Sequence, residues 1–206
     1  MADLRTPPGR AGRMRVSRSL DVARRGADLL DQKLRILRTE HERLVRADRA
    51  ARERWHARLT EAETWLRRGL LLGGEEALTA PAAGHLTALE IGWASTMGVR
   101  HPRTAVCTIP ELSPDTPPAE NSALLLAETA YADAVRAAAE SAAAHEAARA
   151  VGEELLKTRQ RLRALRRQWI PRLESALARA DAALEQAEHE DAVRRRWAAG
   201  SAGKTR

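Results

Sequence analysis

The segment RVSRSLDVARRGADLLDQKLRIL, residues 15–37, decides the fold of this chain. Its apolar residues recur at alternating steps of three and four, which is the spacing of a coiled-coil helix. The same spacing returns in the C-terminal part of the chain, where alanine fills many of the positions. The two segments predict an all-α fold, a long antiparallel two-helix coiled-coil hairpin whose backbones approach closely. We expect the seam between the helices to contain Val16, Leu20, Leu30, Leu34, Leu37, Leu44, Trp55, Leu155, Leu162, Leu165, Trp169 and Leu173.

Polar residues and glycines interrupt this apolar repeat. His41 and Asp48 occupy two seam positions, where a polar side chain either loosens the packing or selects one register of the helices. Gly26 and Gly152 lie inside the predicted helices, where glycine costs about 1 kcal/mol relative to alanine. Close approach of a helix or of a partner would explain them, and simple tolerance is the alternative.

Breaks in the helical pattern divide the chain into five segments. Between Gly73 and Glu120, proline and glycine recur too often for a helix longer than two turns. Within this segment the β-prone residues 104–109 are expected to pair with residues 89–94. The predicted segments are a disordered basic arm (1–13), an N-terminal coiled-coil helix (14–72), a central irregular or β-hairpin segment at the end opposite the termini (73–119), a C-terminal coiled-coil helix (120–198) and a disordered basic tail (199–206).

Pro171 lies inside the predicted C-terminal helix. Proline removes one backbone hydrogen bond from a helix and crowds the preceding turn. We therefore expect a local bend at this position.

The positive charge collects at both ends of the chain. Residues 1–25 hold seven arginines against Asp3 and Asp21, and residues 193–206 hold five cationic residues and no acid. An antiparallel hairpin brings its two ends together, so we expect a basic tip that seeks an acidic or phosphate-bearing surface. A nucleic acid and an acidic protein socket both meet that description. The expected tip residues are Arg13, Arg15, Arg18, Arg194, Arg195 and Arg196.

Several classes of function are disfavoured by the residues present. Cys107 is a single cysteine and the six histidines are scattered, so neither a disulfide nor a metal site is expected. The run Gly203-Lys204-Thr205 lacks the earlier glycine of a phosphate-binding loop. Apolar runs are far shorter than the roughly 18 residues of a membrane-spanning helix, and no secretion signal is recognised. We therefore expect a non-catalytic cytoplasmic protein with no catalytic, cofactor-binding or metal-binding residues.

Three separated motifs together resemble one known family. They are Leu20-x-x-Ala23-x-x-Gly26-x-x-Leu29-Leu30-x-x-Lys33, then Met97-Gly98-Val99-Arg100-x-Pro102, and finally Thr158-Arg159-x-Arg161-Leu162-x-Ala164-Leu165 followed by Ile170-Pro171-Arg172-Leu173-Glu174. In this order they resemble the D subunit of the V-type (archaeal/vacuolar-type) ATPases, the central rotor shaft. The motif positions of most interest are Gly26, Leu29, Leu30, Lys33, Met97, Gly98, Val99, Thr158, Arg159, Arg161, Ile170, Pro171 and Leu173.

The resemblance implies a role in a rotary ATPase/ATP synthase complex. The paired termini would insert into the ring of A and B subunits, and the F subunit would bind alongside the coiled coil. The other end would seat in the socket subunit (C/d) on the membrane ring. The chain would bind no nucleotide, would not enter the membrane, and would lie at its cytoplasmic face as a peripheral component. The alternatives are a basic coiled-coil protein that binds nucleic acid and an elongated scaffold.

Overall fold

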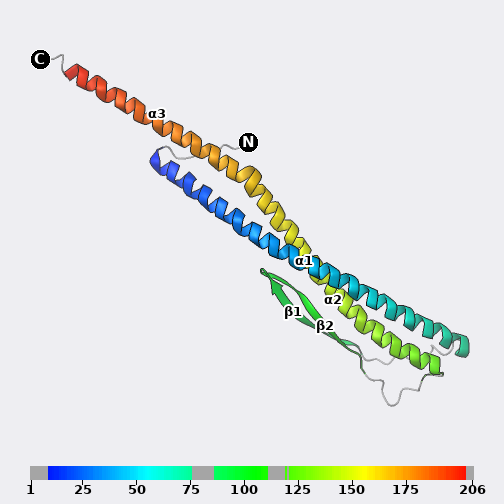
Figure 1. The fold of residues 1–206 in the computed structure, drawn as a ribbon. Helices are drawn as coiled ribbons and strands as arrows, with labels where there is room; N and C mark the ends of the chain where they lie inside the picture. Colours follow the sequence, from blue (N-terminus) through cyan, green and yellow to red (C-terminus); the bar gives the residue numbers. More distant parts are fainter. Residues whose placement is uncertain (1–8, 76–85, 111–118, 120, 203–206) are drawn as a thin grey trace. The chain divides into compact units, whose positions relative to one another are not determined.

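The computed structural model describes residues 9–75, 86–110, 119 and 121–202 (Figure 1). A long helix α1 (Arg10–Gly73) is followed by strands β1 (Ala88–Thr96) and β2 (Val99–Thr108). Helix α2 (Ser122–Ala164), a π-helical turn η2 (Leu165–Trp169) and helix α3 (Ile170–Ala202) complete the chain. The predicted fold class, a helical hairpin with a small β segment, is confirmed. The chain forms two compact units, the first made of Met1–Leu34 with Lys157–Arg206 and the second of Arg35–Leu156.

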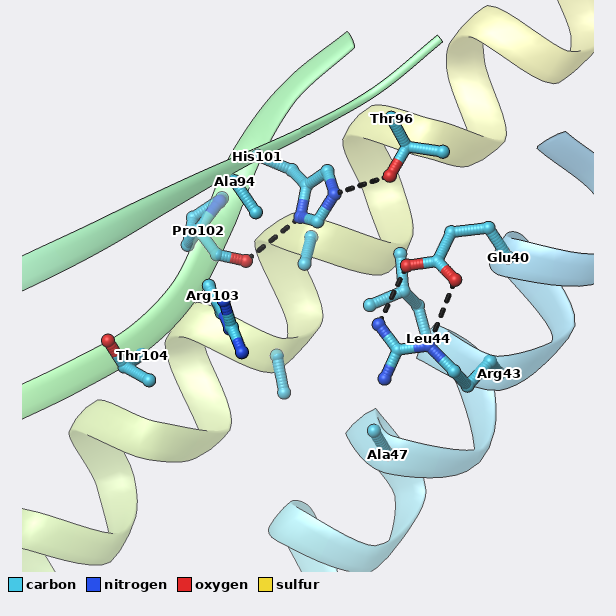
Figure 2. Close-up of a pocket in the computed structure, with 12 residues that line it drawn as sticks. Glu40, Arg43, Leu44, Ala47, Ala94, Thr96, His101, Pro102, Arg103 and Thr104 are labelled. Atoms are coloured by element: carbon cyan, nitrogen blue, oxygen red, sulfur yellow. Dashed lines mark hydrogen bonds and ion pairs between the residues drawn. The ribbon is translucent and has the colours of Figure 1, made fainter. Parts of the chain in front are cut away.

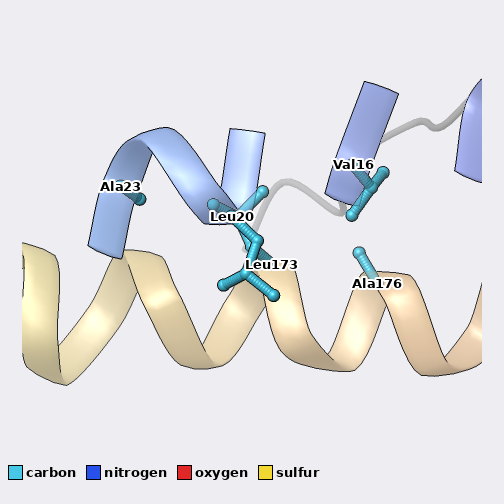
Figure 3. Packing of buried hydrophobic residues seen from close by; sticks show 5 residues of the cluster. All are labelled: Val16, Leu20, Ala23, Leu173 and Ala176. Carbon is cyan, nitrogen blue, oxygen red and sulfur yellow. The ribbon is translucent and has the colours of Figure 1, made fainter. Parts of the chain in front are cut away.

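In the first unit, α1 packs on α3 through small and aliphatic residues. Val16, Leu20 and Ala23 face Leu173 and Ala176, and all five are buried (Figure 3). Residues that lie later in α1 contact residues that lie earlier in the C-terminal part, so the helices are antiparallel. The apolar area that these five side chains remove from water stabilises the contact between α1 and α3.

The first turn of α1 begins earlier than the sequence predicts. The range 1–13 was expected to be disordered, but the helix starts at Arg10, directly after Gly9 with φ at +88°. Ion pairs to α3 stabilise this turn, because Arg10 contacts Glu188 at 2.9 Å and Arg13 contacts Asp181. At the other terminus α3 extends to Ala202, past the predicted boundary at residue 198. Residues 1–8 and 203–206 of the predicted arm and tail lie outside the described residues.

A π-helical turn directly precedes Pro171. Its backbone is closed by the Ile170 N–H, which donates to the Leu165 carbonyl five residues earlier. The extra residue in this turn shifts the helical phase, so Ile170 packs against the core of the first unit. Trp169, predicted to lie in the seam, is 42% exposed, and the π turn explains why that placement is wrong. The bend expected at Pro171 stays a prediction, and the structure shows a π turn just before this residue.

In the second unit, α1 packs on α2 around a second core. Leu37 and Val151 are completely buried at its centre, and Leu44, Ala147 and Ala148 surround them. The end of this helix pair is closed by Asn121, whose side chain caps α2 by accepting from the Leu124 N–H at 2.9 Å. The same side chain donates to the Gly69 carbonyl at 3.1 Å, so one residue joins the two helices.

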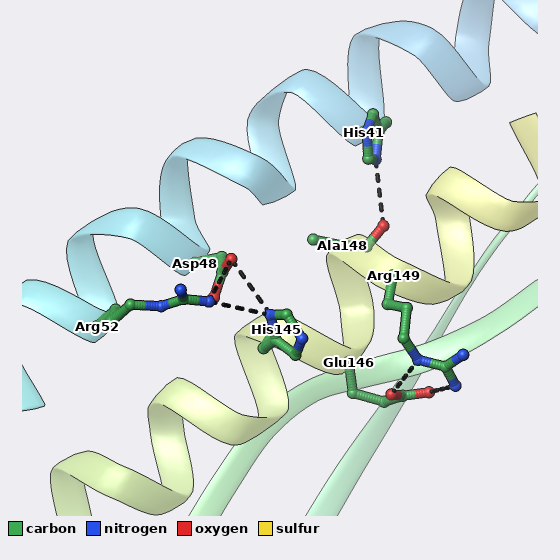
Figure 4. A network of polar contacts seen from close by, with 7 residues as sticks. All are labelled: His41, Asp48, Arg52, His145, Glu146, Ala148 and Arg149. Carbon is green, nitrogen blue, oxygen red and sulfur yellow. Dashed lines mark hydrogen bonds and ion pairs between the residues drawn. The ribbon is translucent and has the colours of Figure 1, made fainter.

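The two polar seam residues each find a partner on the facing helix (Figure 4). His41 contacts the Ala148 carbonyl through Nδ1 at 3.2 Å, and its ring occupies the space that a side chain on Gly152 would need. Asp48 Oδ2 lies 3.4 Å from Arg52 and 3.5 Å from His145 Nδ1. Each contact specifies which turns face each other, in keeping with a role in selecting the register.

The central segment contains an antiparallel β hairpin. Residues 89–92 pair with residues 104–107, as the sequence predicts. Ala94 instead pairs with His101, which lies before the predicted range 104–109. The register shifts after Gly92, where Arg103 forms an extra residue in β2. The strands of the hairpin run alongside the helices of this unit (Figure 1).

A two-residue turn at Met97 and Gly98 brings the strands together. Both residues have positive φ, at 50° and 82°, which is the conformation of the tight turns that match strand twist. Val99, immediately after the turn, packs against the core around Leu37.

Gly26 and Gly152 should respond oppositely to alanine. Gly26→Ala should raise the free energy of unfolding by about 1 kcal/mol, because no atom lies within 4 Å of the added Cβ. Gly152→Ala should lower it, because the Cβ would lie 2.8 Å from His41 Cε1. Urea unfolding followed by circular dichroism measures both.

The control is the double variant His41→Ala, Gly152→Ala, in which the obstructing ring is absent. The alanine at residue 152 should then cost less than it does beside His41. Destabilisation of equal size in both backgrounds would contradict the packing explanation.

Candidate functional site

A cavity of about 490 Å³ lies between the β hairpin and the two helices of the second unit (Figure 2). Its helical wall carries an ion pair in which Arg43 contacts both carboxylate oxygens of Glu40, the closer at 2.7 Å. The hydrogen bond from Arg43 lowers the pKa of Glu40 below its usual range. The hairpin wall carries His101, which is buried. The lining residues are Glu40, Arg43, Leu44, Ala47, Ala94, Thr96, His101, Pro102, Arg103, Thr104, Ala144 and Ala147.

The polar groups of this cavity bind one another. His101 Nδ1 lies 3.0 Å from the Pro102 carbonyl, which requires Nδ1 to donate, and Nε2 lies 3.2 Å from the Thr96 hydroxyl. Within the described residues, no group of three or more His, Cys, Asp or Glu residues could hold a metal ion. These hydrogen bonds lie within the hairpin and within α1, and it is Val99 that packs the hairpin against the helical core. Position 101 was the unspecified residue of the Met97–Pro102 motif, so the sequence indicated the segment but not the buried histidine.

The outer face of the hairpin is apolar. Leu89, Ile91 and Trp93 alternate along β1 on the face opposite Ala94 and Thr96, and Trp93 is 50% exposed. The guanidinium of Arg100 lies 4.4 Å from the centre of the Trp93 ring. A hairpin with one solvated face usually carries polar residues there, so exposed apolar residues indicate a protein-binding surface. The period-two spacing of these residues was the signal for this face in the sequence.

A second apolar patch lies where α1 ends and α2 begins. Leu71 is 87% exposed, and Leu72 and Leu126 are exposed beside it. Together with Trp65 they line an open cavity of about 390 Å³. At the edge of this patch, the guanidinium of Arg68 lies over the Trp65 ring, 4.6 Å from the ring centre. Exposed leucines at this density are typical of a surface that another protein covers.

In the first unit the expected basic residues are exposed, and some already have acidic partners. Arg13 pairs with Asp181. Arg194 lies 3.5 Å from Glu190 and 3.4 Å from Asp191 on its own helix. Arg15 and Arg18 on α1 and Arg195 and Arg196 on α3 are also exposed. Trp197, also on α3, is 79% exposed. The end of α3 past Glu188 therefore presents arginines and a large apolar side chain together.

The predicted seam residues are buried to different degrees. Val16, Leu20, Leu37, Leu44, Leu162 and Leu173 are buried, and Leu30, Leu34, Trp55, Leu155 and Leu165 are half-buried.

The residues of the three family motifs divide between packing and surface. Thr158 is 1% exposed, Ile170 packs beside the buried Leu173, and Leu30 is half-buried. Arg159 and Arg161 are exposed. Leu29 is exposed as well, and Gly26 and Lys33 are half-buried beside it. Packing within the chain therefore accounts for some motif positions and leaves others open to a partner.

Among the described residues, no helix has the combination of length and apolar character needed to cross a bilayer.

Comparison with known proteins gives a consistent result. The family model for the D subunit of ATP synthase matches residues 13–200. The D subunit of a V-type ATP synthase from Anaeromyxobacter sp. (strain Fw109-5) is 31% identical over 195 residues, which cover 92% of this chain and 91% of that protein. The match spans both units and all three motifs. The chain therefore belongs to the family of ATP synthase D subunits, as its motifs predicted.

Proposed function

We propose that this chain is the central stalk, or rotor, component of a V-type ATPase/ATP synthase. It would transmit torque between the catalytic A/B head and the membrane rotor ring. The observation that carries the proposal is that, in a member of this family, each unit is an antiparallel helix pair closed by a packed apolar seam. Two packed helices resist twisting better than a single helix, because twisting would break the seam contacts of both helices at once.

Torque transmission requires different contacts at different rotor angles. A shaft that presents unlike faces to the surrounding sites shifts their conformational populations as it turns. The exposed surface of this chain meets this requirement, because its basic, apolar and mixed patches lie on different elements. The chain itself would be a non-catalytic component without a cofactor.

Three surfaces support assignments to particular partners. The basic end of α3, with Arg194–Arg196, suits the A and B subunits of the head. The patch around Leu71 and Leu72 suits the socket subunit on the membrane ring. The outer hairpin face around Trp93 suits the F subunit, bound alongside the helices. Through these partners the chain would lie at the cytoplasmic face of the membrane as a peripheral component.

Co-expression with the A, B and F subunits tests the proposal directly. The full chain should co-purify with them as one complex, and its omission should abolish rotation of a bead attached to the F subunit. A chain that fails to join the complex and instead binds DNA, with affinity falling steeply as salt rises, would support the nucleic-acid alternative.

Positive charge at the end of α3 should be needed for coupling ATP hydrolysis to rotation. Replacing Arg194, Arg195 and Arg196 by glutamine should reduce ATP-driven rotation several-fold and leave binding of the F subunit unchanged, because these residues face the proposed head partner. Rotation rates and pull-down of the F subunit measure the two effects.

The matched control removes the same charge elsewhere, by replacing Arg38, Arg58 and Arg67 with glutamine. These three are exposed and paired with acids on their own helix. An equal loss of rotation in both triple variants would argue that net charge, not position, is responsible.

The π turn and Pro171 should make the shaft locally compliant. Pro171 has no N–H for the Arg167 carbonyl, so this stretch has weaker backbone restraint than the regular helix. Pro171→Ala restores a donor and should lower the torsional compliance measured in single-molecule rotation. The substitution Ala178→Ser, in regular α3, serves as the control and should leave the compliance unchanged. Equal compliance of wild type and Pro171→Ala would refute this role.

A further inference from the structure

The two flanks of α1 differ in the first unit. One flank carries the residues that form ion pairs with the C-terminal part, namely Arg10, Arg13, Arg24 and Asp31. Their spacings of 3, 11 and 7 place them on one side of the seam. The flank on the other side of the seam carries Val22, Gly26, Leu29 and Lys33, which we call the outer stripe.

The outer stripe has its own coiled-coil spacing. Its members follow one another at steps of four, three and four, one residue before the seam positions Ala23, Ala27, Leu30 and Leu34. A helix with two such seams side by side can pack on two neighbouring helices at once. The first seam is filled by the C-terminal helices of this unit.

The apolar members of the stripe are open to solvent. Val22 is 63% exposed and Leu29 is 66% exposed, although both lie in a regular helix where a polar residue would fold equally well. Between them Gly26 has no atom within 4 Å of the position of a Cβ. A helix-interior glycine that faces open space permits the close approach of another backbone.

Charge around the stripe determines the kind of partner. Helical geometry places Arg15, Arg18 and Arg25 on the same face of α1, and all three are exposed. Arg25 donates through Nε to the backbone carbonyl of Asp21 at 3.3 Å, a contact that uses only one of the donors of its guanidinium. Cationic residues that border an apolar seam pair with acidic residues at the corresponding positions of the partner helix.

We propose that the outer stripe binds an acidic amphipathic helix of a partner protein, which adds a third helix to the pair. Apolar residues of that helix would contact Val22 and Leu29, its backbone would cross at Gly26, and its Glu or Asp residues would meet Arg15, Arg18 and Arg25. This inference goes beyond the rotor function and stands on the face of α1 alone, so the two can fail separately.

Two labelled synthetic helices test it against the full chain by fluorescence anisotropy. Both carry the same heptad ridge of leucines, one flanked by glutamates and the other by lysines. The glutamate peptide should bind more tightly than the lysine peptide. Leu29→Glu should weaken its binding by about tenfold or more, because it replaces an apolar side chain that the peptide would bury with a charged one. Gly26→Leu should weaken it as well by blocking close approach.

The matched control is Leu156→Glu, since Leu156 is a leucine of the second unit that is 57% exposed. It should leave the affinity unchanged. Arg18→Glu provides a second variant, which should weaken the glutamate peptide and strengthen the lysine peptide while circular dichroism shows unchanged helicity. Failure of both peptides to bind, equal affinity for the two, or unchanged affinity in Leu29→Glu would each overturn the inference.

Discussion

The structure depends on the close approach of two antiparallel helices, which small seam residues make possible. Ala51 and Ala62 on α1 are buried, as are Ala134 and Ala148 on α2, and none of them would fill the space between widely separated helices. Dispersion and the hydrophobic effect stabilise this contact only when the backbones are near enough to exclude water. Glycine carries the approach further where the facing residue is large, as at Gly69, whose added Cβ would lie 2.5 Å from Leu124.

Close approach by alanines has a weakness, because similar small residues fit one another in several registers. Polar contacts at defined positions remove that ambiguity in the second unit. His41 meets one backbone carbonyl, and Asp48 meets one histidine across the seam. The hairpin adds a further restraint, since Val99 joins the core around Leu37. Slippage by one turn would break all these contacts together.

Function in such a molecule lies on the surfaces that packing leaves uncovered. Exposed leucines and tryptophans lie at the end of the helix pair in the second unit, on the hairpin and on α3, and Leu29 is exposed on the outer stripe. Large apolar side chains that gather on one exposed surface mark sites where other proteins bind. The family relationship and the distribution of these surfaces therefore both indicate a protein that works as a subunit of a complex.

The sequence by itself determined the helical repeat, the family and most of the seam, because each depends on local spacing that the chain carries in order. It left the central segment as either irregular or a β hairpin, and the structure decided for the hairpin. The tertiary structure alone decided the phase at Trp169, since one extra residue in a π turn moves a whole helical face and no repeat predicts where it is inserted. It also decided which glycine has a neighbour: Gly152 faces His41, and Gly26 faces open space. Identical residues in the same kind of helix differ because the residue across the gap, far away in the sequence, sets the space that each one has.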